Sequence, residues 1–353
     1  MKKTILINIL ILFAVMTTLV FSLAVSLDFY RFLKSKNFIS SNVDERSKLP
    51  NYKNLNWAKL HFKEFSSMKS SYYDGIGWRR DDFKGETINI VKGYRLNNPE
   101  EKFNLKKDIW IFGGSTVWGT GVRDHETIPA YLEKLTKLST LNLGESGYTS
   151  SQELNLYIKN VILHKPKIVF FYDGFNDVFY KCRKENNYFS GARENFIQKK
   201  IRKEHYVDSY TSEFFNPVKK IVSKIINKKK NINLFFDCDK NLEKSKKIAK
   251  IFVNNWIIAN NISKENNIKF IPILQPVAYF TESLTDHIDL DDQVKVQFET
   301  VYPLIIEEIK EKKLSFVDLT KSLNDKKYYY IDSTHVSPIG NKNIAIDIVK
   351  KMQ

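Results

Sequence analysis

A short segment near the end of this 353-residue chain pairs a carboxylate with an imidazole. Asp332 and His335 stand three positions apart in the run Asp-Ser-Thr-His. In a turn, this spacing lets the carboxylate accept a hydrogen bond from one ring nitrogen while the other nitrogen faces outward, as a general base requires. We therefore expect a nucleophilic side chain from elsewhere in the chain to lie against His335.

The best candidate for that nucleophile is Ser115. It follows Gly113 and Gly114, which come directly after the apolar run 109–112. Two glycines permit a sharp turn that leaves the hydroxyl exposed at the start of a helix, where backbone N–H groups can stabilise an oxyanion. Alone, however, a glycine turn with a capping serine is more typical of an ordinary strand-to-helix connection.

Two further segments bring glycine and amide groups to predicted strand ends. Residues 142–150 read Asn-Leu-Gly-Glu-Ser-Gly-Tyr-Thr-Ser, and residues 173–177 read Asp-Gly-Phe-Asn-Asp, with a neutral amide between two carboxylates. Each by itself is typical of a turn. Ligands bind outside the carboxyl ends of the strands in an open parallel sheet, so we expect all four segments to meet there.

Regular alternation of strands and helices begins at residue 108. Short apolar runs predict strands at 109–112, 140–143, 168–172, 269–274 and 315–319. Helical patterns occupy residues 128–138, 152–163, 242–265, 292–312 and 343–352. Strands that alternate with helices predict a parallel sheet covered on both sides.

The alternation is interrupted once, between Val178 and Asn241. We interpret residues 178–241, rich in Lys, Asn, Phe and Tyr, as a partly helical insertion over the carboxyl edge of the sheet, where it could shape a substrate groove. The two cysteines of the chain, Cys182 and Cys238, both fall in it. They would form one disulfide in an oxidising compartment, with two buried thiols as the alternative, and they are too few and too far apart for a zinc cluster.

The N-terminal region has a different composition. Residues 5–27 are apolar and uncharged over a length that spans a bilayer, which favours an uncleaved transmembrane anchor over residues 1–27. A cleaved signal peptide is the alternative, and in both cases we expect the catalytic part to be extracytoplasmic. Residues 28–106 are irregular and polar, which predicts a juxtamembrane stalk and an accessory lead-in with a strand at 86–91.

The formal net charge is +16, from 56 Lys and Arg against 40 Asp and Glu. A solvated surface is the first interpretation of this excess. Attraction to anionic headgroups or to an acidic glycan is the alternative, through the lysines at 219, 220, 224 and 228–230. Because no aromatic-basic motif of a nucleic-acid module accompanies these lysines, nucleic acid is not an expected partner.

Together, the four strand-end segments resemble the sequence blocks of the SGNH (GDSL-like) hydrolase superfamily. The resemblance extends from about residue 108 to 352 and places an SGNH domain at 107–353. It implies a flavodoxin-like three-layer α/β/α sandwich with a mostly parallel sheet, preceded here by the N-terminal transmembrane helix. One departure is Gly114, where the GDSL form has an aspartate.

Carried over residue by residue, the resemblance assigns a role to each chemical group. Ser115 becomes the nucleophile, and His335 becomes the base that Asp332 orients. The oxyanion donors become the backbone N–H groups of Ser115 and Gly147 and the amide of Asn176. Gly144 is the less favoured alternative to Gly147.

These assignments imply a membrane-anchored serine esterase that removes O-acyl groups, in particular acetyl groups, from a cell-envelope glycan. The chemistry requires neither a metal nor an organic cofactor. If a sugar hydroxyl replaces water as the acyl acceptor, the same site becomes an O-acyltransferase of a surface polysaccharide. A lipase or thioesterase, and a non-catalytic glycan-binding module, are the remaining alternatives.

Overall fold

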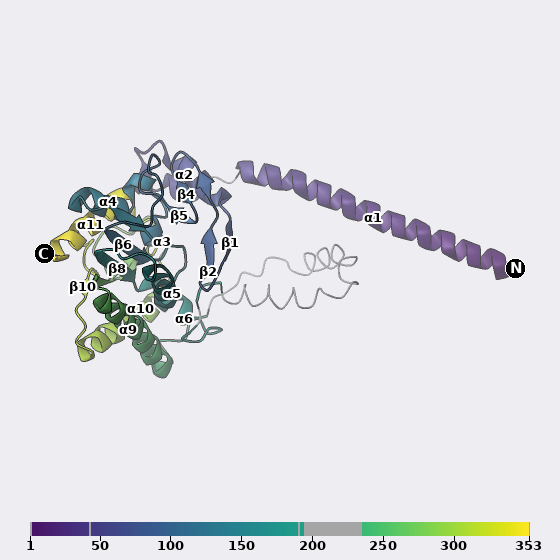
Figure 1. Cartoon of the computed structure of the whole chain (residues 1–353). Helices are drawn as coiled ribbons and strands as arrows, with labels where there is room; N and C mark the ends of the chain where they lie inside the picture. Colours follow the sequence, from purple (N-terminus) through teal and green to yellow (C-terminus); the bar gives the residue numbers. More distant parts are fainter. Residues whose placement is uncertain (1, 42–43, 190, 194–234, 353) are drawn as a thin grey trace. The chain divides into compact units, whose positions relative to one another are not determined.

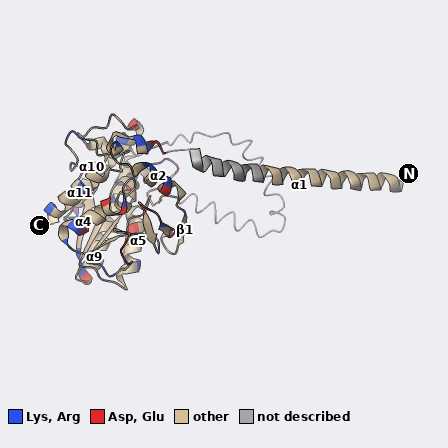
Figure 2. Ribbon diagram, turned by 90° about the horizontal axis from the view of Figure 1, so that it is seen from above, with Lys and Arg blue, Asp and Glu red and all other residues tan. Residues whose placement is uncertain are grey.

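The computed structural model describes residues 2–41, 44–189, 191–193 and 235–352 (Figure 1). Helix α1 (Lys2–Ser41) belongs to one unit, and the described residues from 44 onward form a folded body. Within α1, the stretch Thr4–Leu27 is the one helical segment of the described residues that is long and apolar enough to cross a bilayer. It carries no charged side chain (Figure 2), a property that a signal sequence shares.

The centre of the body is a five-stranded parallel sheet. Its strand order is β10-β9-β8-β6-β7. The strands are β6 (Ile109–Gly113), β7 (Thr140–Asn142), β8 (Ile168–Asp173), β9 (Lys269–Leu274) and β10 (Val317–Asp318). In sequence order this is the 2-1-3-4-5 arrangement of flavodoxin-like folds, which confirms the predicted fold class.

Both faces of the sheet are buried because successive side chains of each strand point to opposite sides. In β6, Trp110 and Phe112 enter one hydrophobic cluster, whereas Ile109 and Ile111 enter another. All four side chains are fully buried. A continuous apolar run in the sequence therefore becomes two core layers in the structure.

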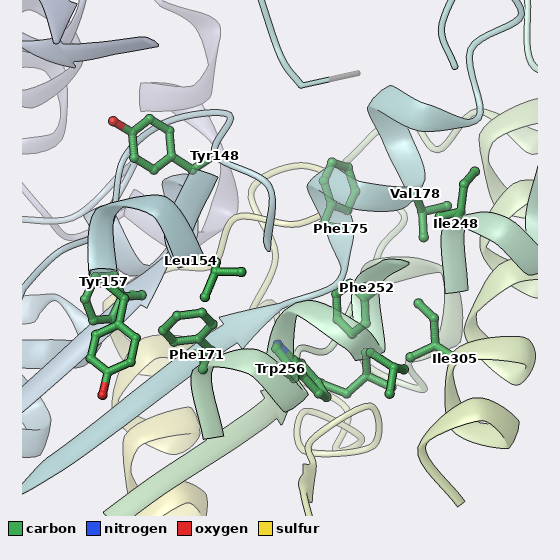
Figure 3. Packing of buried hydrophobic residues seen from close by; sticks show 14 of the residues in the cluster. Tyr148, Leu154, Tyr157, Phe171, Phe175, Val178, Ile248, Phe252, Trp256 and Ile305 are labelled. Carbon is green, nitrogen blue, oxygen red and sulfur yellow. The ribbon is translucent and has the colours of Figure 1, made fainter. Parts of the chain in front are cut away.

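Helices cover each face of the sheet (Figure 1). The face that includes Ile109 packs against α4 (Ile128–Thr136) and α11 (Pro338–Met352). The opposite face packs against α5 (Ser150–Val161), α9 (Leu242–Glu265) and α10 (Asp292–Glu311). Figure 3 shows the side chains of this second layer, including Leu154, Phe171, Phe252, Trp256 and Ile305.

The C-terminal elements differ in extent from the sequence prediction. Helix α11 begins at Pro338, five residues before the predicted start, because proline is well tolerated in the first turn of a helix. Strand β10 is only Val317–Asp318, so the predicted strand 315–319 is shorter at this edge of the sheet.

Residues 44–95 form short elements of their own. They are η1 (Glu45–Lys48), η2 (Pro50–Tyr52), α2 (Ala58–Ser67), the hairpin β1 (Ser70–Tyr73) and β2 (Gly77–Arg80), and the meander β3 (Phe83–Lys84), β4 (Asn89–Val91) and β5 (Tyr94–Arg95). The strand predicted at 86–91 corresponds to β4.

Two buried arginines attach this lead-in to the sheet domain. Arg80 forms an ion pair with Glu145 at 2.7 Å, and Arg95 forms one with Asp124 at 2.9 Å. Arg95 is 1% exposed and also donates to the carbonyl oxygens of Trp118, Gly119 and Val122. Breaking either pair would leave an uncompensated buried charge, which is strongly destabilising. The two ion pairs therefore hold the lead-in against the loops that follow β6 and β7.

Helix α6 (Phe175–Lys181) extends into the predicted insertion at 178–241, most of which lies outside the described residues. Cys182 and Cys238 are joined by a disulfide with an S–S distance of 2.06 Å. Next to it, Arg183 and Phe236 form an antiparallel bridge. The lysines at 219, 220, 224 and 228–230, considered above for anion binding, lie outside the described residues.

Candidate active site

Ser115 lies where the turn after β6 becomes a helix. It is the first residue of α3 (Ser115–Trp118), so its own N–H has no acceptor within the helix. Gly113 must be a glycine here, because a Cβ on it would lie 2.3 Å from the Val117 side chain. This tight turn presents the partly exposed Ser115 side chain at the carboxyl edge of the sheet.

His335 reaches Ser115 from the loop before α11. Its Nε2 lies 2.6 Å from Ser115 Oγ, and its Nδ1 lies 2.6 Å from Asp332 Oδ2. The loop organises itself around the carboxylate, since Asp332 Oδ1 accepts from the backbone N–H groups of Thr334 at 3.0 Å and His335 at 2.8 Å. An imidazole held between a carboxylate and a hydroxyl is oriented to remove the hydroxyl proton.

The surroundings of Asp332 keep it ionised. Partial burial by itself raises the pKa of this carboxyl, but the adjacent imidazole and the three hydrogen bonds lower the pKa to about 2. Hydrogen bonds to the charged form of a carboxylate favour that form. The ionised carboxylate can therefore accept a hydrogen bond from the Nδ1–H group of His335 and orient the ring.

The glycine at 147 and the amide at 176 flank the same space. Gly147 has a φ of 81°, and within the described residues its N–H has no acceptor. Asn176 lies in the first turn of α6, where its Nδ2 donates to the Tyr148 carbonyl at 2.7 Å. One Nδ2 hydrogen is thus used to fix the amide, and the other is free for a ligand.

Gly144 is placed differently. Its N–H donates to Asn142 Oδ1 at 3.0 Å, and a Cβ on it would lie 2.4 Å from the backbone nitrogen of Trp118. It allows the chain to pack closely against α3. With its N–H already bound, Gly144 is a poorer oxyanion donor than Gly147.

Gly114 also has a defined neighbour. A Cβ at this position would lie 2.3 Å from Nδ2 of Asn176. An aspartate at this position, as in the GDSL pattern, would therefore require the Asn176 amide to move from its present place. The sequence showed the departure at this position, and the structure supplies a steric reason for it.

These groups share one pocket of about 410 Å³. Ser115, Gly147, Asn176, Asp332 and His335 all line it. The remaining lining residues are Arg46, Phe65, Thr120, Ser146, Phe175, Phe179, Tyr180, Ala192, Arg193, Ser333 and Thr334. Aromatic walls with a few convergent polar groups are typical of small-molecule sites.

Arg46 is a pocket residue that the sequence did not indicate. It comes from η1, is held by Asp44 at 2.8 Å and stacks 4.8 Å from the Phe62 ring centroid. Its Nη1 lies 3.9 Å from Asp332 Oδ2. No motif surrounds Arg46, because its contact with Asp332 joins residues that are far apart in the chain.

The two carboxylates of the segment 173–177 are buried instead of lining the pocket. Asp177 accepts from the N–H and the hydroxyl of Ser150 at 2.9 and 2.8 Å, and it forms a fully buried ion pair with Lys181 at 2.5 Å. This carboxylate ties the start of α5 to the helix that carries Asn176. Ser150 follows the loop that contains Gly147, so this contact holds the end of that loop against α6.

Asp173 belongs to a second buried group behind the site. It accepts from the Trp256 indole at 2.7 Å and lies beside Glu153. Burial raises the pKa of Asp173 to about 7 and, together with the neighbouring carboxylates, raises the pKa of Glu153 well above its ordinary value. One of these two carboxyl groups is therefore protonated in the folded state near neutral pH.

Within the described ranges, no group of three or more His, Cys, Asp or Glu side chains is arranged to hold a metal ion. A doubly wound parallel sheet with a Ser-His-Asp trio at its carboxyl edge is the architecture of a serine hydrolase. The site lies beside β6 and β8, where the strand order reverses and such folds bind their ligands.

The chain belongs to the GDSL-like lipase/acylhydrolase family, whose model matches residues 109–348. This match confirms the resemblance to SGNH hydrolases and the assignment as an enzyme of that type. No curated protein matches the chain at a significant level.

Solved structures to which the chain is similar include two esterases and a lipase. An acetylxylan esterase from Geobacillus stearothermophilus is 13% identical, with 71% of this chain and 96% of that one covered and a TM-score of 0.40. An acetyl xylan esterase is 15% identical, covering 69% and 100%, with a TM-score of 0.40. A GDSL-like lipase from Bacteroides thetaiotaomicron is 16% identical, covering 69% and 85%, with a TM-score of 0.36.

Proposed function

We propose that the chain is a membrane-anchored serine esterase that removes O-acyl groups, in particular acetyl groups, from a cell-envelope glycan. The observation that carries this proposal is the continuous contact from Asp332 through His335 to Ser115 Oγ, with both links at 2.6 Å. It lies in a pocket that also contains unused backbone and amide donors. These are the groups that acyl transfer from an ester requires.

In the first half of the reaction, Ser115 Oγ attacks the ester carbonyl carbon as His335 Nε2 takes the hydroxyl proton. Asp332 stabilises the imidazolium that forms, without being protonated itself. His335 then gives the proton to the leaving sugar oxygen. The products are a free glycan hydroxyl and an acyl group esterified to Ser115.

The negative charge that develops on the carbonyl oxygen is held by three donors. These are the N–H groups of Ser115 and Gly147 and the Nδ2 group of Asn176. Asn176 is fixed before substrate binds by its bond to Tyr148 O, and Gly147 by its place in a buried loop. Such preorganised donors are typically worth about 10²- to 10³-fold in kcat each.

In the second half, His335 activates a water molecule, which attacks the acyl group on Ser115 and releases the acid. A sugar hydroxyl in place of water would make the enzyme an acyltransferase. The geometry around Ser115 is the same for both acceptors. The proposal of hydrolysis is therefore tested by following where the acyl group goes.

The size and lining of the pocket support a small acyl group on a sugar. A volume of about 410 Å³ is at the lower end of the range for small-molecule sites. Phe175, Phe179 and Tyr180 offer aromatic surface to a sugar ring, whereas Ser146 and Thr120 offer hydroxyl groups.

The proposed location is a single-pass membrane protein with the catalytic body outside the cytoplasm. Thr4–Leu27 supports the anchor by its length and composition. The disulfide between Cys182 and Cys238 supports an oxidising compartment, since disulfides persist there and are rare in the cytosol. An export reporter fused to the C-terminus should be active, and an inactive reporter would contradict this topology.

The function is tested on the full chain in a nonionic detergent with p-nitrophenyl acetate, in the presence and absence of a soluble glycan acceptor. We expect release of acetate in both conditions and its loss in Ser115→Ala. Transfer of acetyl to the glycan would identify an acyltransferase instead. Unchanged turnover by a folded Ser115→Ala variant would overturn the proposal.

A further inference from the structure

Arg193 is a pocket residue that the reaction described above does not use. Its side chain is exposed, and its guanidinium carbon lies 5.1 Å from the centroid of the Trp78 ring. In the part of the chain that the structure describes, no carboxylate lies within 4.0 Å of its nitrogens. Its φ of 61° is in the left-handed region, which is uncommon for a residue with a side chain and clusters at functional sites.

The residue before Arg193 packs against the loop that carries Gly147. The preceding residue, Ala192, is 2% exposed, and a Cβ on Gly147 would lie 3.0 Å from its methyl group. Trp78, over which the guanidinium lies, donates to the Ser146 carbonyl at 3.3 Å. Arg193 is therefore held beside the loop that carries Gly147.

The other charged side chains of the pocket already have partners. Arg46 is paired with Asp44 at 2.8 Å, and the Asp332 carboxylate is bound by His335 at 2.6 Å. Arg193 remains as the cation without a counter-charge among these residues. A guanidinium binds a carboxylate or a phosphate with two parallel hydrogen bonds and stacks well on an aromatic face.

We propose that Arg193 binds an anionic group on the sugar that carries the acyl ester, so that the substrate is an acidic glycan. This assignment rests on the proposed esterase function. The sugar ring lies against the aromatic side chains of the pocket, and its carboxylate or phosphate accepts from Arg193. The ester carbonyl is then directed to Ser115.

The test compares three acetylated probes on the full chain in a nonionic detergent. A methyl glucoside and a methyl glucuronide differ only in whether C6 is a hydroxymethyl group or a carboxylate, and a methyl glucoside 6-phosphate provides the phosphate form. Arg193→Ala is the test variant. Lys165→Ala removes the same charge from an exposed site that does not line this pocket and serves as the matched control.

We expect the wild type to have a higher kcat/KM for the two anionic probes than for the neutral one. The anionic probe with the higher kcat/KM identifies a carboxylate or a phosphate as the recognised group. Arg193→Ala should raise KM for that probe about three- to tenfold, as expected for a charge-assisted contact that is open to solvent. The neutral probe should be unaffected, Lys165→Ala should retain the preference, and Arg193→Lys should recover part of it.

A wild type that hydrolyses neutral and anionic probes equally would overturn the Arg193 assignment and leave the esterase proposal standing. So would an anionic preference that survives in Arg193→Ala. A wild type that hydrolyses neither the three probes nor p-nitrophenyl acetate would overturn the esterase function, and this assignment with it.

Discussion

The close approach of Gly114 to Asn176 leads to a specific prediction for the variant Gly114→Ala. The added methyl carbon would lie 2.3 Å from Asn176 Nδ2. Ordinary carbon contacts begin at about 3.5 Å, so the amide must retreat by about 1 Å. The backbone at Gly114 accepts alanine without strain, since its φ is −76°.

The displacement acts on catalysis and not on the fold. Asn176 would lose its 2.7 Å bond to Tyr148 O and its aim at the ester oxygen. Loss of one oxyanion donor lowers kcat by about 10²- to 10³-fold, equivalent to about 3 to 4 kcal/mol of transition-state stabilisation. Because only the tip of one side chain moves, the melting temperature should stay close to that of the wild type.

A double-mutant cycle tests this reasoning. The kcat for p-nitrophenyl acetate is measured for Gly114→Ala, Asn176→Ala and the double variant. We expect the two single losses to be similar and the double variant to resemble Asn176→Ala, because both changes remove the same donor. A Gly114→Ala enzyme within about threefold of wild type, or losses that add in full, would refute the predicted coupling.

Three further predictions concern the orienting carboxylate, the buried acid pair and the disulfide. Asp332→Asn should lower kcat by about 10³- to 10⁴-fold in steady-state assays, because an amide that donates to Nδ1 of His335 leaves Nε2 protonated; retention of a tenth of the activity would contradict this. Burial raises the pKa of Glu153 in the folded protein, so its contribution to stability is fully present below the unfolded-state pKa of about 4.3 and is lost as the pH rises through the folded-state pKa. Glu153→Gln should therefore flatten the fall in the free energy of urea unfolding between pH 5 and 8, by at most about 1.4 kcal/mol per pH unit. An equal slope in both proteins would argue against a buried proton there. Replacing Cys182 and Cys238 by serine opens a loop with a sequence separation of 56 and should cost about 4 kcal/mol in thermal or urea unfolding, whereas no change would show that the bridge is absent from the folded protein.

The sheet could be predicted from the sequence because its signal is local. Each strand is a short apolar run that ends in turn residues, and each long helix repeats its apolar positions every three or four residues. The chemistry-bearing loops follow from the same pattern, since the carboxyl ends of parallel strands share one edge. Only the extent of the elements changed, as at Pro338 and in β10.

The lead-in could not be predicted in the same way because its stability comes from distant contacts. The ion pair of Arg80 with Glu145 joins residues 65 positions apart, and Glu145 looked like an ordinary loop residue. The contact of Arg46 with Asp332 joins residues near opposite ends of the sequence of the folded body. Neither contact leaves a periodic or motif-like trace in the sequence.

The reason for the glycine at 114 was equally hidden. In the sequence it was a departure from a family pattern, and only the position of Asn176 shows which group a side chain there would displace. Asn176 itself was expected in a turn, whereas it lies in the first turn of α6. Packing at the scale of single atoms decides such points.

The central claim is that Ser115 is a nucleophile activated by His335. It is tested most directly by treating the full chain with a fluorophosphonate probe and mapping the adduct by peptide mass spectrometry. We predict one adduct, on Ser115, that is absent in Ser115→Ala and forms much more slowly in His335→Ala. A folded protein that does not react, or an adduct on another serine, would contradict the account.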